Sequence, residues 1–141
     1  MGNVKSLFMN PLKSKNAFNK AAIQAKGYKE YTFAIRQSGT DAPVLYLIKN
    51  DFGVTPLTAS YTTIGQYGMD LSTLGYTYAD RLDWSLVISN AKLYGKGYLS
   101  ARMPAPEPNL RIFTPNESNI LENGILTDEY CTTISIRKTI D

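Results

Sequence analysis

Residues 28–53 read YKEYTFAIRQSGTDAPVLYLIKNDFG, and this stretch decides the fold of the chain. In its first apolar run, Tyr28–Gln37, the large side chains of Tyr31, Phe33 and Ile35 alternate with smaller or polar ones. That period of two is typical of a half-buried strand. The second apolar run is Val44–Lys49, and the intervening residues SGTDAP are rich in turn formers. The stretch therefore predicts a strand, a loop and a second strand.

Further short strands are expected along the rest of the chain, separated by Gly, Pro and Asn turns. We place them at Thr58–Ile64, Met69–Leu74, Trp84–Ser89, Tyr94–Met103, Leu110–Phe113 and Tyr130–Lys138, with Gly95 and Gly97 as interruptions or bulges in the fourth of these. The 141 residues suffice for one domain with a substantial core. The sequence predicts a mainly β protein, an antiparallel β-sandwich of jelly-roll or immunoglobulin-like type over residues 28–141, with a short N-terminal α-helical extension.

Residues 1–27 form a separate, lysine-rich segment in this interpretation. The first 29 residues hold six lysines and no acidic side chain, whereas the remaining nine basic and twelve acidic residues leave a charge of −3. Ser14 is placed to cap a helix over residues 14–26, and Gly27 to end it. Phe18, Ala21, Ala22 and Ala25 have the spacing of one apolar stripe.

A helix this short depends on packing for its stability. Two alternatives follow for residues 1–27. The helix either covers part of its own β domain or, together with Val4, Leu7 and Phe8, docks on another chain. We expect a docking or oligomerisation segment.

The composition excludes several kinds of catalytic site. The chain has no histidine and one cysteine, Cys131, so a Ser-His-Asp triad, a Cys-His pair and an intramolecular disulfide are excluded. Asp80 and Asp83 are the densest acidic pair, but their spacing is unspecific and turn formation explains it. We expect no enzyme, no catalytic residues, no cofactor and no metal site. Cys131 is expected to be buried, as most free cysteines are.

Nucleic-acid and membrane binding are not expected either. The lysine-rich segment has no arginine and few aromatic residues for base stacking. No uninterrupted apolar stretch approaches the roughly 18 residues that span a bilayer, and no signal peptide is recognised. The chain is expected to be made as a soluble intracellular protein.

Ten tyrosines are more than one core of this size can hold, so some are expected on a contact surface. We assign surface contact to Tyr61, Tyr67, Tyr76 and Tyr78. One alternative is that the tyrosines are simply scattered between core and surface. Another is a carbohydrate-binding adhesion module in which exposed tyrosines and Trp84 stack on sugar rings.

Two motifs resemble a known group of proteins. The residues YKEYTFAIRQSGTDAP at 28–43, and Gly124-Ile125-Leu126 followed by Ile134-Ser135-Ile136-Arg137, are similar to the two ends of the β domain in small virion-associated proteins. Those proteins are encoded by bacteriophages and prophages of Bacteroidota, including crAss-like phages. The residues at 49–53 depart from the group's pattern, and the lysine-rich segment matches nothing in it.

This resemblance implies a structural component of a bacteriophage virion, as a head fibre, a capsid decoration or a tail-associated protein. It implies no catalytic residues. We expect the chain to assemble as a homo-oligomer, with a trimer favoured, and to attach to other virion proteins. Its expected location is the virion, after synthesis in the host cytoplasm. A glycan is a further candidate partner.

Overall fold

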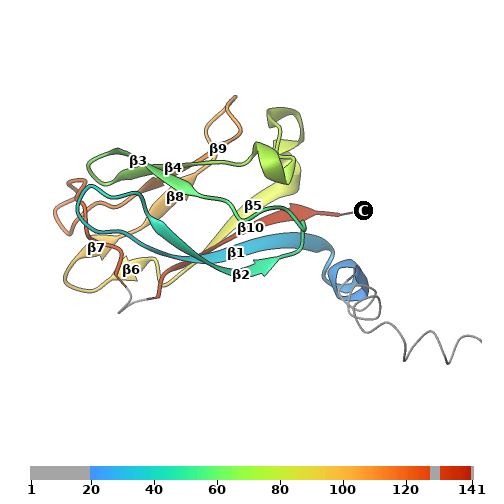
Figure 1. Cartoon of the computed structure of the whole chain (residues 1–141), viewed down its shortest axis with the longest axis horizontal. Coiled ribbons are helices and arrows are strands. Elements are labelled where there is room, and N and C mark those ends of the chain that lie inside the picture. The colour runs from blue at the N-terminus through green and yellow to red at the C-terminus, as the bar shows by residue number, and fades with distance from the viewer. Residues whose placement is uncertain (1–19, 128–130, 141) are drawn as a thin grey trace, which may run out of the picture.

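The protein is mainly β, with antiparallel sheets and one short helix (Figure 1). The computed structural model describes residues 20–127 and 131–140. Residues 20–26 are helical, and strand β1, Tyr28–Arg36, follows directly. The other strands are β2 Val44–Asn50, β3 Ala59–Thr63, β4 Gln66–Asp70, β5 Trp84–Ser89, β6 Lys92–Leu93, β7 Gly97–Tyr98, β8 Ser100–Arg102, β9 Asn109–Phe113 and β10 Thr133–Thr139. Two 3₁₀ turns, η1 Ser72–Leu74 and η2 Tyr78–Asp83, precede β5.

The strands form two four-stranded sheets and a two-stranded hairpin. The first sheet has the order β2-β1-β10-β5, the second has the order β3-β4-β9-β8, and β6 pairs with β7. The first and last strands are neighbours, with Tyr28 opposite Thr139 and Ala34 opposite Thr133. Strands β2 and β5 therefore form the two edges of the first sheet, and β4 and β9 lie in the middle of the second.

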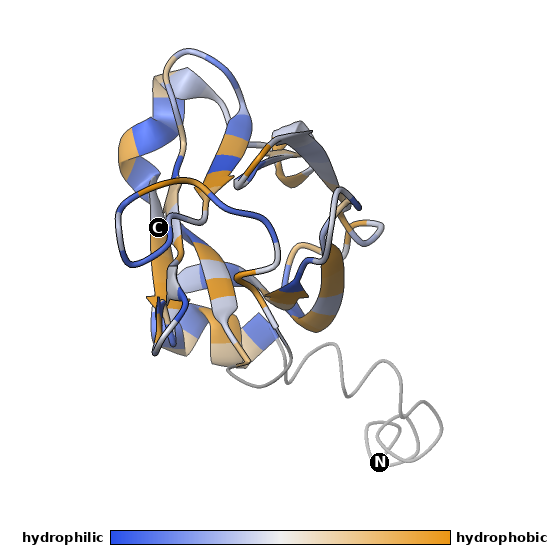
Figure 2. Ribbon diagram, turned by 90° about the vertical axis from the view of Figure 1, so that its left-hand side faces the viewer, coloured by the Kyte–Doolittle hydropathy of each residue, from blue (hydrophilic) through white to orange (hydrophobic). Residues whose placement is uncertain are grey.

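The inward faces of the two sheets share one hydrophobic core. Tyr31, Phe33 and Ile35 of β1 are buried, which confirms the alternation expected from the sequence. They join one cluster with Ile134 and Ile136 of β10 and with buried residues of the second sheet: Tyr67, Met69, Leu110 and Ile112. Orange bands alternate with paler or blue ones along the strands in Figure 2. Each such side chain contributes about 1.5–3 kcal/mol when fully buried.

Two predicted strands are wrong in part. Met69–Leu74 was expected as one strand, but β4 ends at Asp70. The Asp70 Oδ1 accepts a hydrogen bond from the Ser72 N–H at 2.9 Å, and the chain turns there into η1. Tyr94–Met103 was expected as a strand interrupted at Gly95 and Gly97, but residues 94–96 form the turn between β6 and β7 and are not part of a strand.

The expected burial of Cys131 is wrong. Cys131 is exposed and has a positive φ of 47°, and it lies two residues before β10 begins. The next residue, Thr132, is buried instead, and its hydroxyl donates to the Asn90 carbonyl at 3.0 Å. This hydrogen bond satisfies the polar group that burial of a threonine would otherwise leave unpaired.

Candidate functional site

Hydrogen bonds hold the helical segment to the start of β1 and to the residue after β10. The helix ends at Gly27, whose φ of +80° suits glycine, and the Gly27 N–H bonds to the Ile23 carbonyl at 3.0 Å. The Gly27 carbonyl in turn accepts a bond from the N–H of Ile140 at 3.0 Å. Gly27 thus connects the helix to the start of β1 and to the residue that follows β10.

A network of charged side chains reinforces this junction. Lys26 Nζ lies 3.2 Å from Asp51 Oδ2 and 3.4 Å from Glu30 Oε1. Glu30 also meets Lys49 and Arg137, each at 3.4 Å. The Asp51 Oδ2 accepts the Glu30 backbone N–H at 3.0 Å, and the Glu30 carbonyl accepts the Asp51 N–H at 3.0 Å. The carboxylates are largely covered, with side-chain exposures of 14% for Glu30 and 7% for Asp51. Covered ion pairs are screened less by salt than exposed ones.

The network shifts the pKa values of two members. Partial burial by itself would raise the pKa of Glu30, but the ammonium groups of Lys26 and Lys49 hold it below its ordinary value of 4.5. Burial by itself would lower the pKa of Lys26, but Asp51 and Glu30 raise it above its ordinary value of 10.5. The depressed carboxyl contributes stability that is lost as the pH falls through its folded-state pKa. The raised ammonium pKa contributes stability that is lost in strong alkali.

The Glu30→Gln variant is therefore expected to lose about 1–2 kcal/mol of unfolding free energy at neutral pH. Between about pH 7 and pH 3 it should also lose stability less steeply than the parent protein, because the shifted carboxyl is gone. Urea unfolding across that range measures both effects. The matched control is Glu107→Gln, which removes an exposed carboxyl bonded to Arg111 at 3.2 Å. Equal pH dependence in the parent and Glu30→Gln would contradict the assignment.

The predicted docking stripe is only partly visible in the described residues. Ala21 and Ala25 are exposed, and Ala22 is half-buried. Ile23 and Lys26 are half-buried as well, so the helix meets the β domain with the side that carries Ala22, Ile23 and Lys26. A groove of about 470 Å³ lies beside this contact, lined by Ile23, Asn50 and Ile140 among others. The other predicted docking residues, Val4, Leu7, Phe8 and Phe18, lie outside the described residues.

Strand β2, which ends next to this junction, is an apolar strand with exposed side chains. Strand β2 ends one residue before Asp51 and forms an edge of the first sheet. Four of its apolar side chains are exposed: Val44 at 43%, Tyr46 at 45%, Leu47 at 44% and Ile48 at 60%. The strand's one charged residue, Lys49, is paired with Glu30. Edge strands of monomeric proteins are usually protected by charges, prolines or bulges. Strand β2 has a register shift opposite Thr32 and Phe33, but its exposed stretch has no charge or proline.

Two of the four predicted contact tyrosines lie in the core, and their assignment to a surface is wrong. Tyr67 is 1% exposed and donates a hydrogen bond to Gln37 Oε1 at 2.7 Å. Tyr76 is 3% exposed and packs edge-on against Trp84, with ring centroids 5.4 Å apart. Tyr61 is half-buried, and Tyr78 is exposed with the Arg81 guanidinium 4.0 Å from its ring centre. The four residues do not form one contact surface.

Trp84 cannot serve as an open platform for a sugar ring. It is 6% exposed and stacks on Phe52, with centroids 5.7 Å apart and ring planes within 9° of parallel. The faces of the ring are occupied by the protein itself. The proposed stacking role of Trp84 is therefore wrong.

A second exposed apolar region lies at the end of the domain away from the helix. Ile64, in the β3–β4 turn, is 57% exposed, and the adjoining Gly65 carbonyl accepts the Thr114 N–H at 2.9 Å. The loop after Thr114 carries Ile120, 64% exposed, and a bridge between Gly97 and Asn116 joins this loop to the β6–β7 hairpin. Figure 1 shows this hairpin at one end of the domain and the helix at the other.

Asp80, one of the two acidic residues singled out in the sequence, has a structural role. Asp80 Oδ1 accepts hydrogen bonds from the Thr77 N–H at 3.0 Å and the Thr77 hydroxyl at 2.8 Å, which caps η2. Slight burial would raise the pKa of Asp80, but these bonds lower it.

In the part of the chain that the structure describes, no group of three or more acidic or cysteine side chains could hold a metal ion. Among the described helices, none is long and apolar enough to cross a membrane.

Comparison with known proteins identifies no relative of this chain. No protein-family model, no curated protein and no solved structure matches this chain.

Proposed function

We propose that this chain is a structural component of a bacteriophage virion that acts by oligomeric assembly and by attachment to other virion proteins. A head fibre, a capsid decoration or a tail-associated protein fits this role. The two motifs at the ends of the β domain support the virion role through their resemblance to phage proteins. We further propose a location in the virion and a homo-oligomer. Pairing of two β2 edges by itself gives a twofold dimer, so the trimer favoured from the sequence would need a further interface between copies.

The observation that carries the assembly proposal is the uncovered apolar edge strand β2. Within residues 20–127 and 131–140, no strand pairs with the outer side of β2, and its exposed side chains are apolar. A second copy of the chain is the occupant we propose, because edge-to-edge pairing would satisfy these backbone groups. The helix at residues 20–26 lies next to one end of β2, so this helix and β2 would contribute to the same assembly surface.

The shared core of the two four-stranded sheets supports a β-sandwich. The finer assignment to a jelly-roll or immunoglobulin-like type stays a prediction. The carbohydrate-binding alternative is not proposed in its original form, because Trp84, Tyr67 and Tyr76 are buried.

Light scattering of the purified chain is expected to give the mass of an oligomer, and a shortened protein that begins at Gly27 should give a smaller assembly. Ile48→Lys places a charge on the β2 edge and should weaken assembly about tenfold or more, as a like-charge contact does at an interface. Val87→Lys is the matched control: Val87 is 39% exposed on β5, the opposite edge of the same sheet. It should leave the mass unchanged.

A monomeric full-length chain at high concentration would overturn the proposed self-assembly. Equal effects of Ile48→Lys and Val87→Lys would move the interface away from β2. The virion role is tested separately by mass spectrometry of purified phage particles, in which the chain should be present in a fixed ratio to the major capsid protein. Its absence from particles that contain the other virion proteins would overturn that role.

A further inference from the structure

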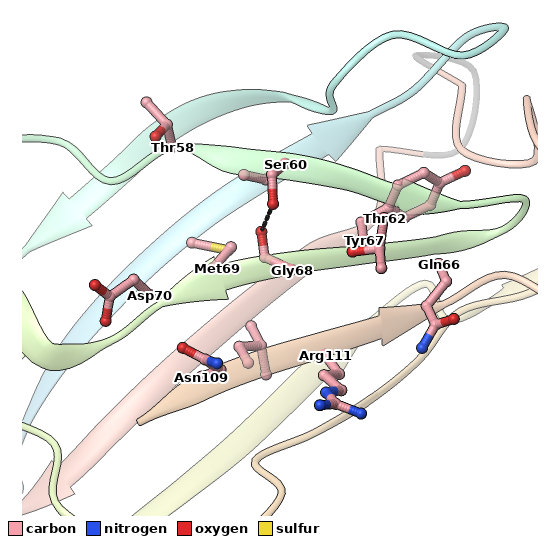
Figure 3. Close-up of a pocket in the computed structure, with 12 residues that line it drawn as sticks. Thr58, Ser60, Thr62, Gln66, Tyr67, Gly68, Met69, Asp70, Asn109 and Arg111 are labelled. Carbon is pink, nitrogen blue, oxygen red and sulfur yellow. Dashed lines mark hydrogen bonds between the residues drawn. The ribbon is translucent and has the colours of Figure 1, made fainter. Parts of the chain in front are cut away.

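The outer face of the second sheet contains a hollow of about 500 Å³ whose lining includes several polar side chains. Figure 3 shows its lining, which comes from three neighbouring strands. Strand β3 contributes Ser60 and Thr62, β4 contributes Gly68, and β9 contributes Asn109 and Arg111. Gln66 and Asp70 lie at the two ends of β4, on either side of Gly68. Because Ser60 and Arg111 are the register partners of Gly68, the floor of the hollow is the backbone of a central strand.

The glycine at position 68 is not required by the backbone. Gly68 is absent from the residues with positive φ, so its conformation is open to other amino acids. A Cβ built there would meet nothing nearer than 3.7 Å, the distance to the hydroxyl oxygens of Ser60 and Thr62. A glycine inside a strand weakens it and often marks a place where another molecule approaches the backbone closely. Its effect here is to keep the hollow open.

The lining has the chemistry of a site for a polyhydroxylated ligand. It presents the hydroxyls of Thr58, Ser60 and Thr62, the amides of Gln66 and Asn109, a carboxylate and a guanidinium, which together can donate and accept. A hydrogen bond from the Ser72 backbone lowers the pKa of Asp70, so that this carboxyl is ionised at neutral pH. Glu107 Oε2 holds both the Asn109 amide and the Arg111 guanidinium at 3.2 Å, which orients these two side chains.

The charged side chains around the hollow nearly cancel, which disfavours strongly charged ligands. Asp70 and Glu107 offset Arg111 and the neighbouring Arg102, so the surface favours neither a phosphate nor a polycation. An apolar partner would leave these polar groups without hydrogen bonds. Phe113, half-buried and opposite Gln66 in the register, lies beside the hollow, but the Arg102 guanidinium lies over its ring, 5.3 Å from the ring centre. Hydrogen bonds, and not ring stacking, would therefore hold a ligand here.

We propose that the hollow over Gly68 binds a neutral saccharide, held by hydrogen bonds from its ring hydroxyls to Asn109, Gln66 and Asp70. This site is separate from the tyrosines and Trp84 considered from the sequence. It does not depend on the virion role or on self-assembly.

The test is a glycan array of neutral bacterial and mammalian oligosaccharides probed with the full-length chain, followed by titration with the glycan that binds. Gly68→Val fills the hollow and should reduce affinity about tenfold or more by steric exclusion. Its melting temperature should stay the same or rise, because valine favours a strand. Ser85→Val is the matched control, since Ser85 is exposed on β5 on the other sheet. It should bind as the parent does.

A second variant, Asn109→Ala, removes an amide without adding volume and should also reduce affinity about tenfold, through loss of a hydrogen-bonded contact. The absence of any bound glycan, or glycan binding that Gly68→Val leaves unchanged, would overturn the proposal. The same protein is also tested on an array of extended peptides. If peptides bind and glycans do not, and Gly68→Val abolishes the peptide binding, the saccharide assignment is overturned as well. Because light scattering reports assembly independently, failure here is distinguishable from failure of the proposed virion function.

Discussion

The Gly97→Ala variant is expected to lose about 3–5 kcal/mol of unfolding free energy, through strain and a clash with the backbone. Gly97 has a φ of +147°, which side chains rarely adopt. An added Cβ would collide with the carbonyl oxygen of Pro115 and lie 2.8 Å from the Cα of Asn116. The same carbonyl accepts the N–H of Tyr98 at 3.0 Å, so any movement that relieves the clash also breaks this bond.

The loss matters because the β6–β7 hairpin covers the core through Leu93 and Leu99, which are 1% and 3% exposed. Denaturant unfolding measures the effect. Gly95→Ala is the matched control in the same hairpin: its φ is +74°, but nothing lies within 4 Å of the added Cβ. That variant should lose only about 1 kcal/mol, the cost of placing alanine in a left-handed conformation. Equal losses in the two variants would show that close approach to Pro115 is unimportant.

The Gln37→Leu variant is expected to lose about 2–4 kcal/mol, because it leaves buried polar groups without partners. Gln37 is 4% exposed, and its Oε1 accepts hydrogen bonds from the Tyr67 hydroxyl at 2.7 Å and the Gly124 N–H at 2.9 Å. Its Nε2 donates to the carbonyls of Gly39 and Asp41 at 2.9 and 3.0 Å. This one amide therefore joins the loop after β1 to β4 and to residue 124.

A double-mutant cycle with Tyr67→Phe separates the hydrogen bond from the packing. Leucine resembles glutamine in size, and phenylalanine keeps the ring of Tyr67, so both variants mainly remove polar contacts. Burial raises the pKa of Tyr67, which keeps its hydroxyl a donor well into alkaline solution. The loss in the double variant should be smaller than the sum of the single losses, because both remove one shared bond. Additive losses in urea unfolding would contradict a direct coupling.

The strands were predictable where one face is buried and the other is not. Strand β1 shows this best, since the alternation of Tyr31, Phe33 and Ile35 follows directly from a core on one side. Strand β5 has the predicted bounds for a similar reason. The pairing of β1 with β10 was not predictable, because the partners are about a hundred residues apart and local patterns do not encode register at that distance.

The aromatic residues were harder to assign than the strands. Trp84 is buried between Phe52, from the loop after β2, and Tyr76, and both contacts depend on the tertiary fold. Tyr67 is buried because Gln37 satisfies its hydroxyl. Neither partner is adjacent in sequence. An aromatic residue with a polar group can lie in a core or on a surface, and its partners decide which.

Gly68 is a residue that the sequence analysis missed, although a local signal existed. A glycine between Tyr67 and Met69, inside a stretch that alternates as a strand, is unusual enough to indicate close approach by another group. The hollow itself could not be predicted, since its walls come from β3 and β9. Similarly, the lysine and carboxylate residues of the helix junction are visible in the sequence, but their convergence on Glu30 is not.

The bond between Ile140 and Gly27 has a mechanical consequence. It places the two ends of the β domain side by side, at the same end of the adjacent strands β1 and β10 (Figure 1). A force that pulls these two ends apart would open the pair one hydrogen bond at a time. A force between Gly27 and the far end of the domain would instead run along the strands and strain many of their bonds together. A domain held through its helix and pulled at its opposite end would therefore resist in its stronger direction.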